Sequence, residues 1–405
     1  MRAIVSAATS GAASAATSGA ASEAVASGGT ERARIASLSI SNFRNIARAE
    51  LELPADGIAI VGDNGHGKTN LLEAIAYLEL LRSMRGARDR DVIAFGSDTF
   101  HVGAEIEGAR ARRVSVGADR SGAKRVQLDG VELPRMTDAL GAVPSVCFSP
   151  ADVALVTAGP SERRRYLDIV LALTEPAYLA ALRMYRAALA RRNAALRMGR
   201  LDRAAVRAWE PALATNGATL MTARRTWAAD FRERFAALAL AAGETQTMTL
   251  QYHSPFANAA NPETALAEAL DASREQDVNR GVTQTGPHRD DLDISLGGHD
   301  LRTTGSAGQH RTAAIALRLL EAETFRARTS TQPLVLLDDP FAELDRGRAS
   351  KVLALLDGAT MGGIGQIVLC VPRADEIPAE FTRLERWGVR NGVFARERAG
   401  EVTHG

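Results

Sequence analysis

The chain has 405 residues, enough for two or three domains that each bury an apolar core. Its apolar and charged fractions are ordinary for a soluble globular protein, and a net charge of +1 does not by itself indicate a nucleic-acid partner. No stretch approaches the roughly 20 apolar residues of a membrane helix. Two cysteines, Cys147 and Cys370, lie too far apart for a disulfide framework or a metal cluster, and they fit a reducing cytosol.

Residues 1–32 are mainly Ala, Ser, Thr and Gly, and the octamer AATSGAAS occurs at 7–14 and again at 15–22. Such a segment buries too little surface to offset its ordering entropy. A signal peptide would need a Leu- or Val-rich run after its basic start, which this sequence lacks. We therefore expect a disordered extension or a mis-assigned translation start.

The rest of the chain divides by its periodicity. Residues 33–150 predict strands near 36–41, 48–53 and 57–61, a helix after a glycine-rich loop, and further strands from about 100 to 148. Residues 151–284 predict a mainly helical arm with a strand near 248–254 and a helix at 262–274. Strand and helix units resume over 285–405. The pattern predicts an α/β head, 33–150 and 285–405, interrupted by the arm.

The sequence GDNGHGKT at 62–69 matches G-x-x-x-x-G-K-[ST], directly after a predicted strand and before a predicted helix. Glycines let backbone N–H groups turn inward around phosphates, and a helix N-terminus favours anions. Lys68 is expected to reach the β- and γ-phosphates, and Thr69 to bind Mg²⁺. A chance glycine turn is the alternative. The predicted ATP contacts in this region are Arg44, Gly62, Asp63, Asn64, Gly65, His66, Gly67, Lys68, Thr69 and Asn70.

A second motif, PLVLLDDPFAELD, covers 333–345. Its four apolar residues 334–337 predict a buried parallel strand. Asp338 at the strand end is expected to hold Mg²⁺, and Asp339 to orient the attacking water. The alternative is a core strand that ends in a solvated turn. The AELD segment at 342–345 resembles the D-loop of ABC-type ATPases.

The sequence TGSAGQHRT at 304–312 resembles the ABC signature, with Ser306, Gly308 and Gln309 as S-x-G-Q. A small hydroxyl residue and a glycine at a helix tip can approach a γ-phosphate closely, and in ABC-type dimers the tip belongs to the opposite subunit. An ordinary N-cap is the alternative, and both can hold at once. The chain after GQIVLCV has no histidine that would serve as a γ-phosphate sensor, so the sensor stays unassigned.

Four further stretches resemble one family. They are SISNFRN at 39–45, FSPADVALVTAGPSERRRYLD at 148–168, YRAALARRNAALR at 185–197 and TGPHRDDL at 285–292. Together with the three motifs they resemble the RecF family over about 34–372, although His310 replaces the usual Gln. Lys68 and Asp338 are 270 residues apart without sustained heptads, unlike SMC proteins. ABC transporter subunits place their signature helix much nearer the P-loop.

The resemblance implies an ABC-type head with a mixed sheet, and an ATPase with Lys68, Asp339 and Ser306 as catalytic residues. It also implies that ATP drives homodimerisation on gapped or junction DNA, and that slow, DNA-stimulated hydrolysis triggers release. The implied partners are RecR and RecO, with which the protein would support the loading of RecA. The implied location is the cytoplasm, in association with the nucleoid. The alternatives are another SMC-like ATPase, or a nucleotide-dependent DNA clamp or scaffold with negligible turnover.

Charge is distributed unevenly along the chain. Residues 161–240 contain 15 arginines and 7 carboxylates, whereas the whole chain has a net charge of only +1. A basic surface engages phosphates and releases counterions, so we expect the arm to contact duplex DNA, with Arg191, Arg192 and Arg197 among the contacts. Solvated helix faces, with arginine stems covering apolar neighbours, are the alternative.

Overall fold

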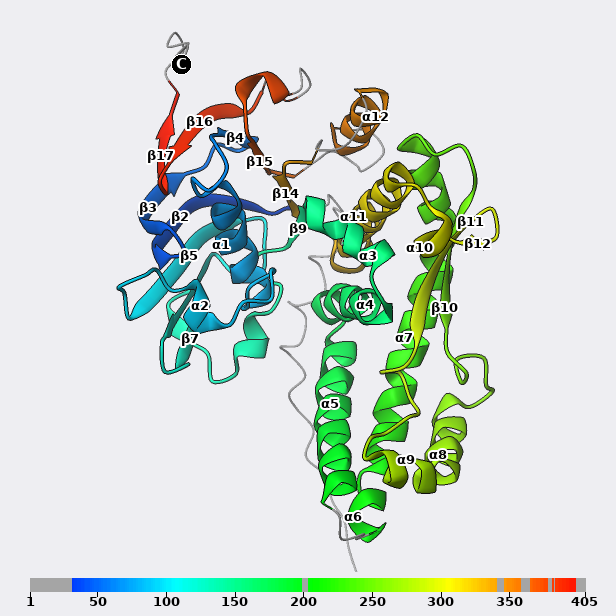
Figure 1. Cartoon of the computed structure of the whole chain (residues 1–405). Helices are drawn as coiled ribbons and strands as arrows, with labels where there is room; N and C mark the ends of the chain where they lie inside the picture. The colour runs from blue at the N-terminus through cyan, green and yellow to red at the C-terminus, as the bar shows by residue number, and fades with distance from the viewer. Residues whose placement is uncertain are drawn as a thin grey trace, which may run out of the picture. The chain divides into compact units, whose positions relative to one another are not determined.

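The computed structural model describes residues 31–198, 203–340, 346–357, 365–377, 381 and 383–397 (Figure 1). Residues 1–30 and the D-loop expected at 342–345 lie outside the described residues. Residues 31 and 32, which the sequence assigned to the extension, instead form a strand. Strand β1 (Glu31–Arg32) pairs in parallel with β13 (Thr331–Gln332), because backbone hydrogen bonds of 3.2 and 3.0 Å hold the main chain there.

An antiparallel sheet of six strands forms one layer, in the order β3-β2-β5-β6-β7-β8. Apolar residues alternate along its strands and face the core, as in Val114, Val116 and Ala118 of β6. The strands predicted for this part of the chain are confirmed. Their bounds are β2 Arg34–Phe43, β3 Ile46–Glu52, β5 Thr99–Glu107, β6 Arg113–Asp119, β7 Lys124–Leu128 and β8 Val131–Glu132.

A second six-stranded sheet has the order β17-β16-β4-β15-β14-β9, parallel except for β17. Its central strands are apolar on both faces, as expected of a sheet covered on both sides. Ile58 of β4 packs into one core cluster, and Ala59 packs into the other. The bounds are β4 Gly57–Val61, β9 Ser145–Phe148, β14 Leu334–Asp338, β15 Ile367–Val371, β16 Glu385–Arg390 and β17 Val393–Arg396.

Helix α1 (Lys68–Leu80) lies between these two sheets and contacts both (Figure 1). Every residue from Leu71 to Glu79 is buried, because the helix is covered on all sides. Its Tyr77 packs edge-on against Phe43 and Phe100 of the antiparallel sheet, with ring centroids 5.9 and 5.2 Å away. The loop that precedes α1 is therefore fixed at the carboxyl edge of β4.

The arm is helical, as predicted, and α5 and α7 run side by side (Figure 1). Its helices are α3 Ala154–Thr157, α4 Pro160–Thr174, α5 Pro176–Arg197, α6 Arg203–Arg207, α7 Glu210–Ala241, α8 Pro262–Ala272 and α9 Arg274–Arg280. A small sheet of β10 (Met248–His253), β11 (Asp291–Leu296) and β12 (His299–Asp300) packs on α7.

This small sheet corrects the expected start of the second head segment at residue 285. Strand β11 pairs antiparallel with β10 along its whole length, from Met248 opposite Leu296 to His253 opposite Asp291. Leu292 and Ile294 are buried beside Leu250 in the arm's core cluster. Residues 291–300 thus extend the arm's sheet, because their apolar face matches that of β10.

The chain then returns to the head through α10 (Leu301–Thr304) and the long helix α11 (Ala307–Thr329). Helix α11 contacts β9 of the head as well as α4 and α7 of the arm. The remaining elements are α2 Asp89–Val92, α12 Arg346–Asp357 and the 3₁₀ turns η1 Met136–Ala139, η2 Pro150–Val153 and η3 Ala374–Glu376. Among the described helices, none has the length and apolarity needed to cross a membrane.

Candidate nucleotide site

The glycine-rich loop joins the end of β4 to the start of α1. Gly65 and Gly67 have φ values of +86° and +118°, which L side chains rarely adopt. A Cβ at Gly67 would also come within 3.0 Å of the Asn45 amide. The backbone therefore turns sharply in front of the first turn of α1, the arrangement in which N–H groups can surround a phosphate.

Lys68 and Thr69 lie at the head of that turn. The Lys68 ammonium is buried and donates to the carbonyls of Gly62 and, at 3.0 Å, Asp63. The Thr69 hydroxyl donates to the Asp338 carboxylate, 2.9 Å from each oxygen. The two residues predicted to hold Mg²⁺ are thus adjacent, although they are 269 residues apart in the chain. A hydroxyl and a carboxylate are the hard oxygen donors that this ion prefers.

The two aspartates share a strained, partly buried turn at the end of β14. Burial raises the pKa of Asp338, and the neighbouring charge of Asp339 adds to the shift. Asp339 has a φ of +46°, and its N–H donates to the Cys370 carbonyl at 2.9 Å. Burial and then the charge of Glu376 raise the pKa of Asp339. A bound cation would offset this unfavourable concentration of negative charge, so the residues fit a Mg²⁺ site.

Side chains outside the motif brace the loop. The Asn45 amide donates to the Gly65 carbonyl at 3.2 Å and accepts from Asn70 at 2.8 Å. On the other side, the backbone N–H of Asn391, in the β16–β17 turn, donates to His66 Nδ1 at 3.0 Å. In the sequence, the NFRN segment indicates only the family, and it does not show this positioning role of Asn45.

Arg44, predicted to contact ATP, forms a bidentate ion pair with buried Glu73 of α1, at 3.0 and 2.9 Å. Its backbone has a φ of +56°, and its N–H donates to the Val92 carbonyl at 2.7 Å. The guanidinium therefore fastens α1 to the turn after β2. Its contact with nucleotide stays a prediction.

Ser306 is the N-cap of α11, as the alternative interpretation of the signature expected. Its N–H donates to Gln309 Oε1 at 2.9 Å, and its hydroxyl accepts from the Gln309 N–H at 3.3 Å. A Cβ at Gly308 would come within 2.6 Å of the Arg348 guanidinium. Among the described residues, no hydrogen bond joins Ser306 to the loop at 62–69, so the phosphate role stays a prediction.

His310, the departure from the family pattern, packs at the junction of α10 and α11. Its Nε2 lies 2.8 Å from the Leu301 carbonyl. The imidazole thus takes part in the turn between the two helices.

Arg311 links the signature helix to the second aspartate. Its guanidinium donates to the carbonyls of Ser149 at 3.0 Å and Pro340 at 3.2 Å. Its charge also opposes the upward shift in the pKa of Asp339. Arg311 was not predicted as a site residue, although it follows the signature almost directly in the sequence.

The three arm arginines predicted to bind DNA differ. Arg191 is exposed and stacks on Trp209, with 4.9 Å between the guanidinium and the ring centroid, and Arg197 is also exposed. The prediction is wrong for Arg192, whose exposed fraction is 0%. Its guanidinium is 2.7 Å from buried Asp277 and 3.1 Å from half-buried Glu210, so it neutralises these carboxylates and presents no charge to solvent.

Other arginines between 161 and 240 are also paired. Arg163 pairs with Asp291 at 2.7 Å, and Arg234 pairs with Glu323. These two carboxylates and Asp277 lie outside residues 161–240 in the sequence, but the fold brings them into contact with arginines of that stretch. The excess of positive charge in the sequence is therefore larger than the excess on the arm surface.

The GPHRDD segment at 286–291 forms side-chain hydrogen bonds with helix α5 and strand β10 of the arm. The Tyr185 hydroxyl lies 2.6 Å from His288 Nδ1, and Asp290 accepts from Tyr252. Burial lowers the pKa of His288 to about 4, so its ring is neutral at physiological pH. These contacts give the segment a place in the arm's buried polar network.

Several known proteins are similar to this chain in sequence. The family model described as RecF/RecN/SMC N terminal domain matches residues 34–373. The chain is 39% identical over 334 residues to DNA replication and repair protein RecF of Anaeromyxobacter sp. (strain K), which covers 80% of this chain and 89% of that relative. This chain belongs to the RecF family. A second RecF, from Lachnoclostridium phytofermentans, is 34% identical and covers 83% of this chain and 92% of its own length.

Solved structures agree with this assignment. The structure described as the recombination mediator protein RecF-ATP in the RecFOR pathway has a TM-score of 0.82 at 26% identity, and covers 91% of this chain and 99% of that one. The Pyrococcus furiosus Smc head domain with an extended coiled coil gives a TM-score of 0.51 at 18% identity, a likeness of fold alone. The ABC-type head with a mixed sheet, expected from the sequence, is confirmed.

Proposed function

We propose that this RecF-family chain is an ATPase that binds ATP with Mg²⁺ at the loop 62–69. The observation that carries the proposal is the contact between Thr69 and Asp338, beside a glycine loop at a helix N-terminus. Lys68 lies in the same turn, where its ammonium can exchange the Gly62 and Asp63 carbonyls for phosphate oxygens. Thr69 and Asp338 would hold the Mg²⁺ ion, which would neutralise charge on the phosphate oxygens.

We assign to Asp339 the role of orienting the attacking water. It follows the metal-holding residue directly, its left-handed backbone turns it away from the line of β14, and its raised pKa suits a carboxylate that accepts a hydrogen bond from water. The water oxygen would form a bond to the γ-phosphorus as the bond to the β-phosphate oxygen breaks, giving ADP and phosphate.

The signature completes the site across a homodimer in this proposal. Ser306 caps a helix of 23 residues, whose N-terminus favours anions, and it makes no recorded contact with its own loop among the described residues. Two chains would close over two nucleotides, each between the loop at 62–69 of one chain and Ser306 of the other. Hydrolysis would reopen the pair.

DNA is the proposed partner, with gapped or junction DNA as the target and RecR and RecO as protein partners. The support is membership of a family whose relatives are named for DNA replication and repair. RecA loading at single-strand gaps is the expected outcome, by the same resemblance. The exposed side chains of Arg191 and Arg197 remain candidate phosphate contacts.

Steady-state phosphate release tests the proposal against a clamp or scaffold without turnover. We expect slow release that gapped DNA accelerates more than blunt duplex, and Asp338→Asn should abolish it. Nucleotide binding without release, with or without DNA, would favour the clamp. Release that Asp338→Asn leaves unchanged would contradict the assigned site.

A further inference from the structure

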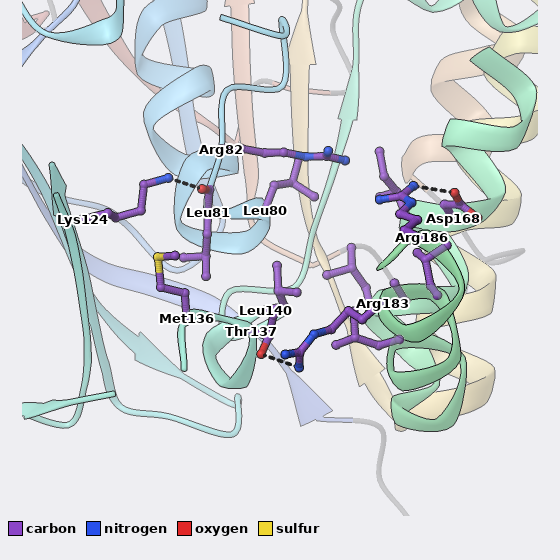
Figure 2. Close-up of a pocket in the computed structure, with 15 residues that line it drawn as sticks. Leu80, Leu81, Arg82, Lys124, Met136, Thr137, Leu140, Asp168, Arg183 and Arg186 are labelled. Atoms are coloured by element: carbon purple, nitrogen blue, oxygen red, sulfur yellow. Dashed lines mark hydrogen bonds and ion pairs between the residues drawn. The ribbon is translucent and has the colours of Figure 1, made fainter. Parts of the chain in front are cut away.

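A pocket of about 290 Å³ lies outside the nucleotide site, between the end of α1, the η1 turn and helices α4 and α5 (Figure 2). Helix α1 has 13 residues, so its two ends are roughly 20 Å apart. The loop at 62–69 lies at one end, and this pocket lies at the other. A ligand here would not compete with ATP for space.

The pocket has an apolar lining. Leucine side chains from three elements face it, namely Leu80 of α1, Leu173 of α4 and Leu182 of α5, together with Leu140 after η1. Met136, which is 46% exposed, lies at the edge. This surface can bury one large apolar side chain of a ligand, which is the typical basis of affinity in a concave site.

Cations surround the apolar lining. Lys124 is satisfied by Asp89 at 2.7 Å, and Arg186 by Asp168 at 2.7 Å. Arg183 donates to the Thr137 hydroxyl at 3.3 Å (Figure 2). The Thr137 hydroxyl is neutral, so it does not balance the charge of Arg183. Among the described residues that line the pocket, cations therefore outnumber carboxylates.

Arg82 is the exposed cation at the rim of this pocket. Figure 2 shows it extending from the end of α1 toward Arg186. In the part of the chain that the structure describes, no hydrogen bond or ion pair is recorded for Arg82. Partial burial, with the charges of Arg165 and Arg186, lowers the pKa of Arg82, and the charge of Asp168 opposes this shift. An exposed guanidinium that lies near other cations is available to pair with an incoming carboxylate.

We propose that this pocket binds an acidic peptide segment of a partner protein, with a large apolar side chain against the leucines and carboxylates at Arg82 and Arg183. Charge complementarity and the apolar lining both favour such a ligand. Duplex DNA has negatively charged phosphates, but it has no apolar side chain that could fill the leucine-lined pocket. An unpaired base fits less well, because none of the described residues that line the pocket is aromatic.

The chain's own first 30 residues do not match this chemistry. They contain one carboxylate, Glu23, and one arginine, and their other residues are almost all small. A separate protein is therefore the occupant that the pocket fits.

A fluorescein-labelled octapeptide of aspartates around a central leucine pair tests the proposal by fluorescence polarisation with the full chain. We expect saturable binding that weakens with salt. Replacing the leucines by serine should weaken it about tenfold or more, and replacing the aspartates by asparagine should abolish it. Saturating ATP should not displace the peptide.

Arg82→Glu should weaken peptide binding at least about tenfold, and Met136→Glu should also weaken it, by placing a carboxylate at the edge of the recess. Arg82→Glu removes no recorded contact, so its thermal unfolding should match wild type. Arg232→Glu is the matched control, because Arg232 is exposed on α7, which contributes no lining residue. It should change affinity less than twofold.

Three results would overturn the proposal. They are no saturable binding by the wild-type chain, equal binding by folded Arg82→Glu, and displacement of the peptide by stoichiometric duplex DNA. The last result would assign the pocket to nucleic acid.

Discussion

Arg192 should be essential to the arm's stability and irrelevant to its DNA affinity in any folded protein. Its guanidinium faces Asp277, and both side chains have no exposed surface. Removing one partner of such a buried pair leaves the other charge uncompensated, which typically costs about 3–5 kcal/mol. Arg192→Ala should therefore lower the free energy of unfolding by about that amount, a large part of a domain's usual stability.

Arg192→Glu should cost more, because a third carboxylate would face Asp277 and Glu210 in the same enclosed place. Thermal unfolding followed by circular dichroism should show a fall in Tm on the order of 10 °C or more for either variant. Arg191→Glu and Arg197→Glu are the matched controls. Both side chains are exposed, so their Tm values should stay within a few degrees of wild type.

A double-mutant cycle sharpens the test. Asp277→Ala together with Arg192→Ala should cost less than the sum of the two single changes, since neither charge is then left alone. A folded Arg192→Glu protein with a wild-type Tm would refute the buried ion pair. It would also restore Arg192 as a candidate for the DNA surface.

Three further predictions concern the head. Asp339→Asn should spare ATP binding, block hydrolysis and trap the closed dimer, so light scattering with ATP should show more dimer than wild type; a monomeric variant beside a dimeric wild type would contradict the assigned roles. Ser306→Arg should leave ATP binding to the monomer intact but prevent dimerisation, and equal dimerisation would argue against a signature that acts across the interface. Burial raises the pKa of Glu79 from 4.5 to about 8, so stability should fall as pH rises between these values, by at most about 1.4 kcal/mol per pH unit. Glu79→Gln should flatten that dependence in urea titrations, and an unchanged slope would show that Glu79 is ionised in the native state.

Local features of the sequence predicted most of the head. The strand before the glycine loop and the helix after it are encoded by neighbouring residues. The apolar residues Leu71, Leu72, Ile75 and Leu78 recur at helical spacing after the loop, and the apolar run 334–337 is typical of a buried strand. The adjacency of Thr69 and Asp338 followed from recognising two motifs together. Spacing alone would not have placed residues 269 apart in contact.

Partners distant in sequence were harder to predict. Arg192 and Arg191 occupy consecutive positions of α5, one facing the core and one facing solvent, and the sequence offered no signal that Asp277 would meet the first. Strand β11 was assigned to the head because its alternation does not say which strand it will pair with. Asn45 was visible as part of a motif, but its contact with Gly65 depends on how β2 and the loop approach each other.

ATP-dependent retention of the chain on gapped DNA tests the central claim most directly, with wild type and Lys68→Ala compared side by side. Lys68 contacts the loop through its ammonium, and its removal should leave the fold intact while taking away the charge meant for the phosphates. We expect wild type to be retained with ATP and released without it, and Lys68→Ala to be released in both conditions. Normal ATP-dependent retention of folded Lys68→Ala would contradict the account.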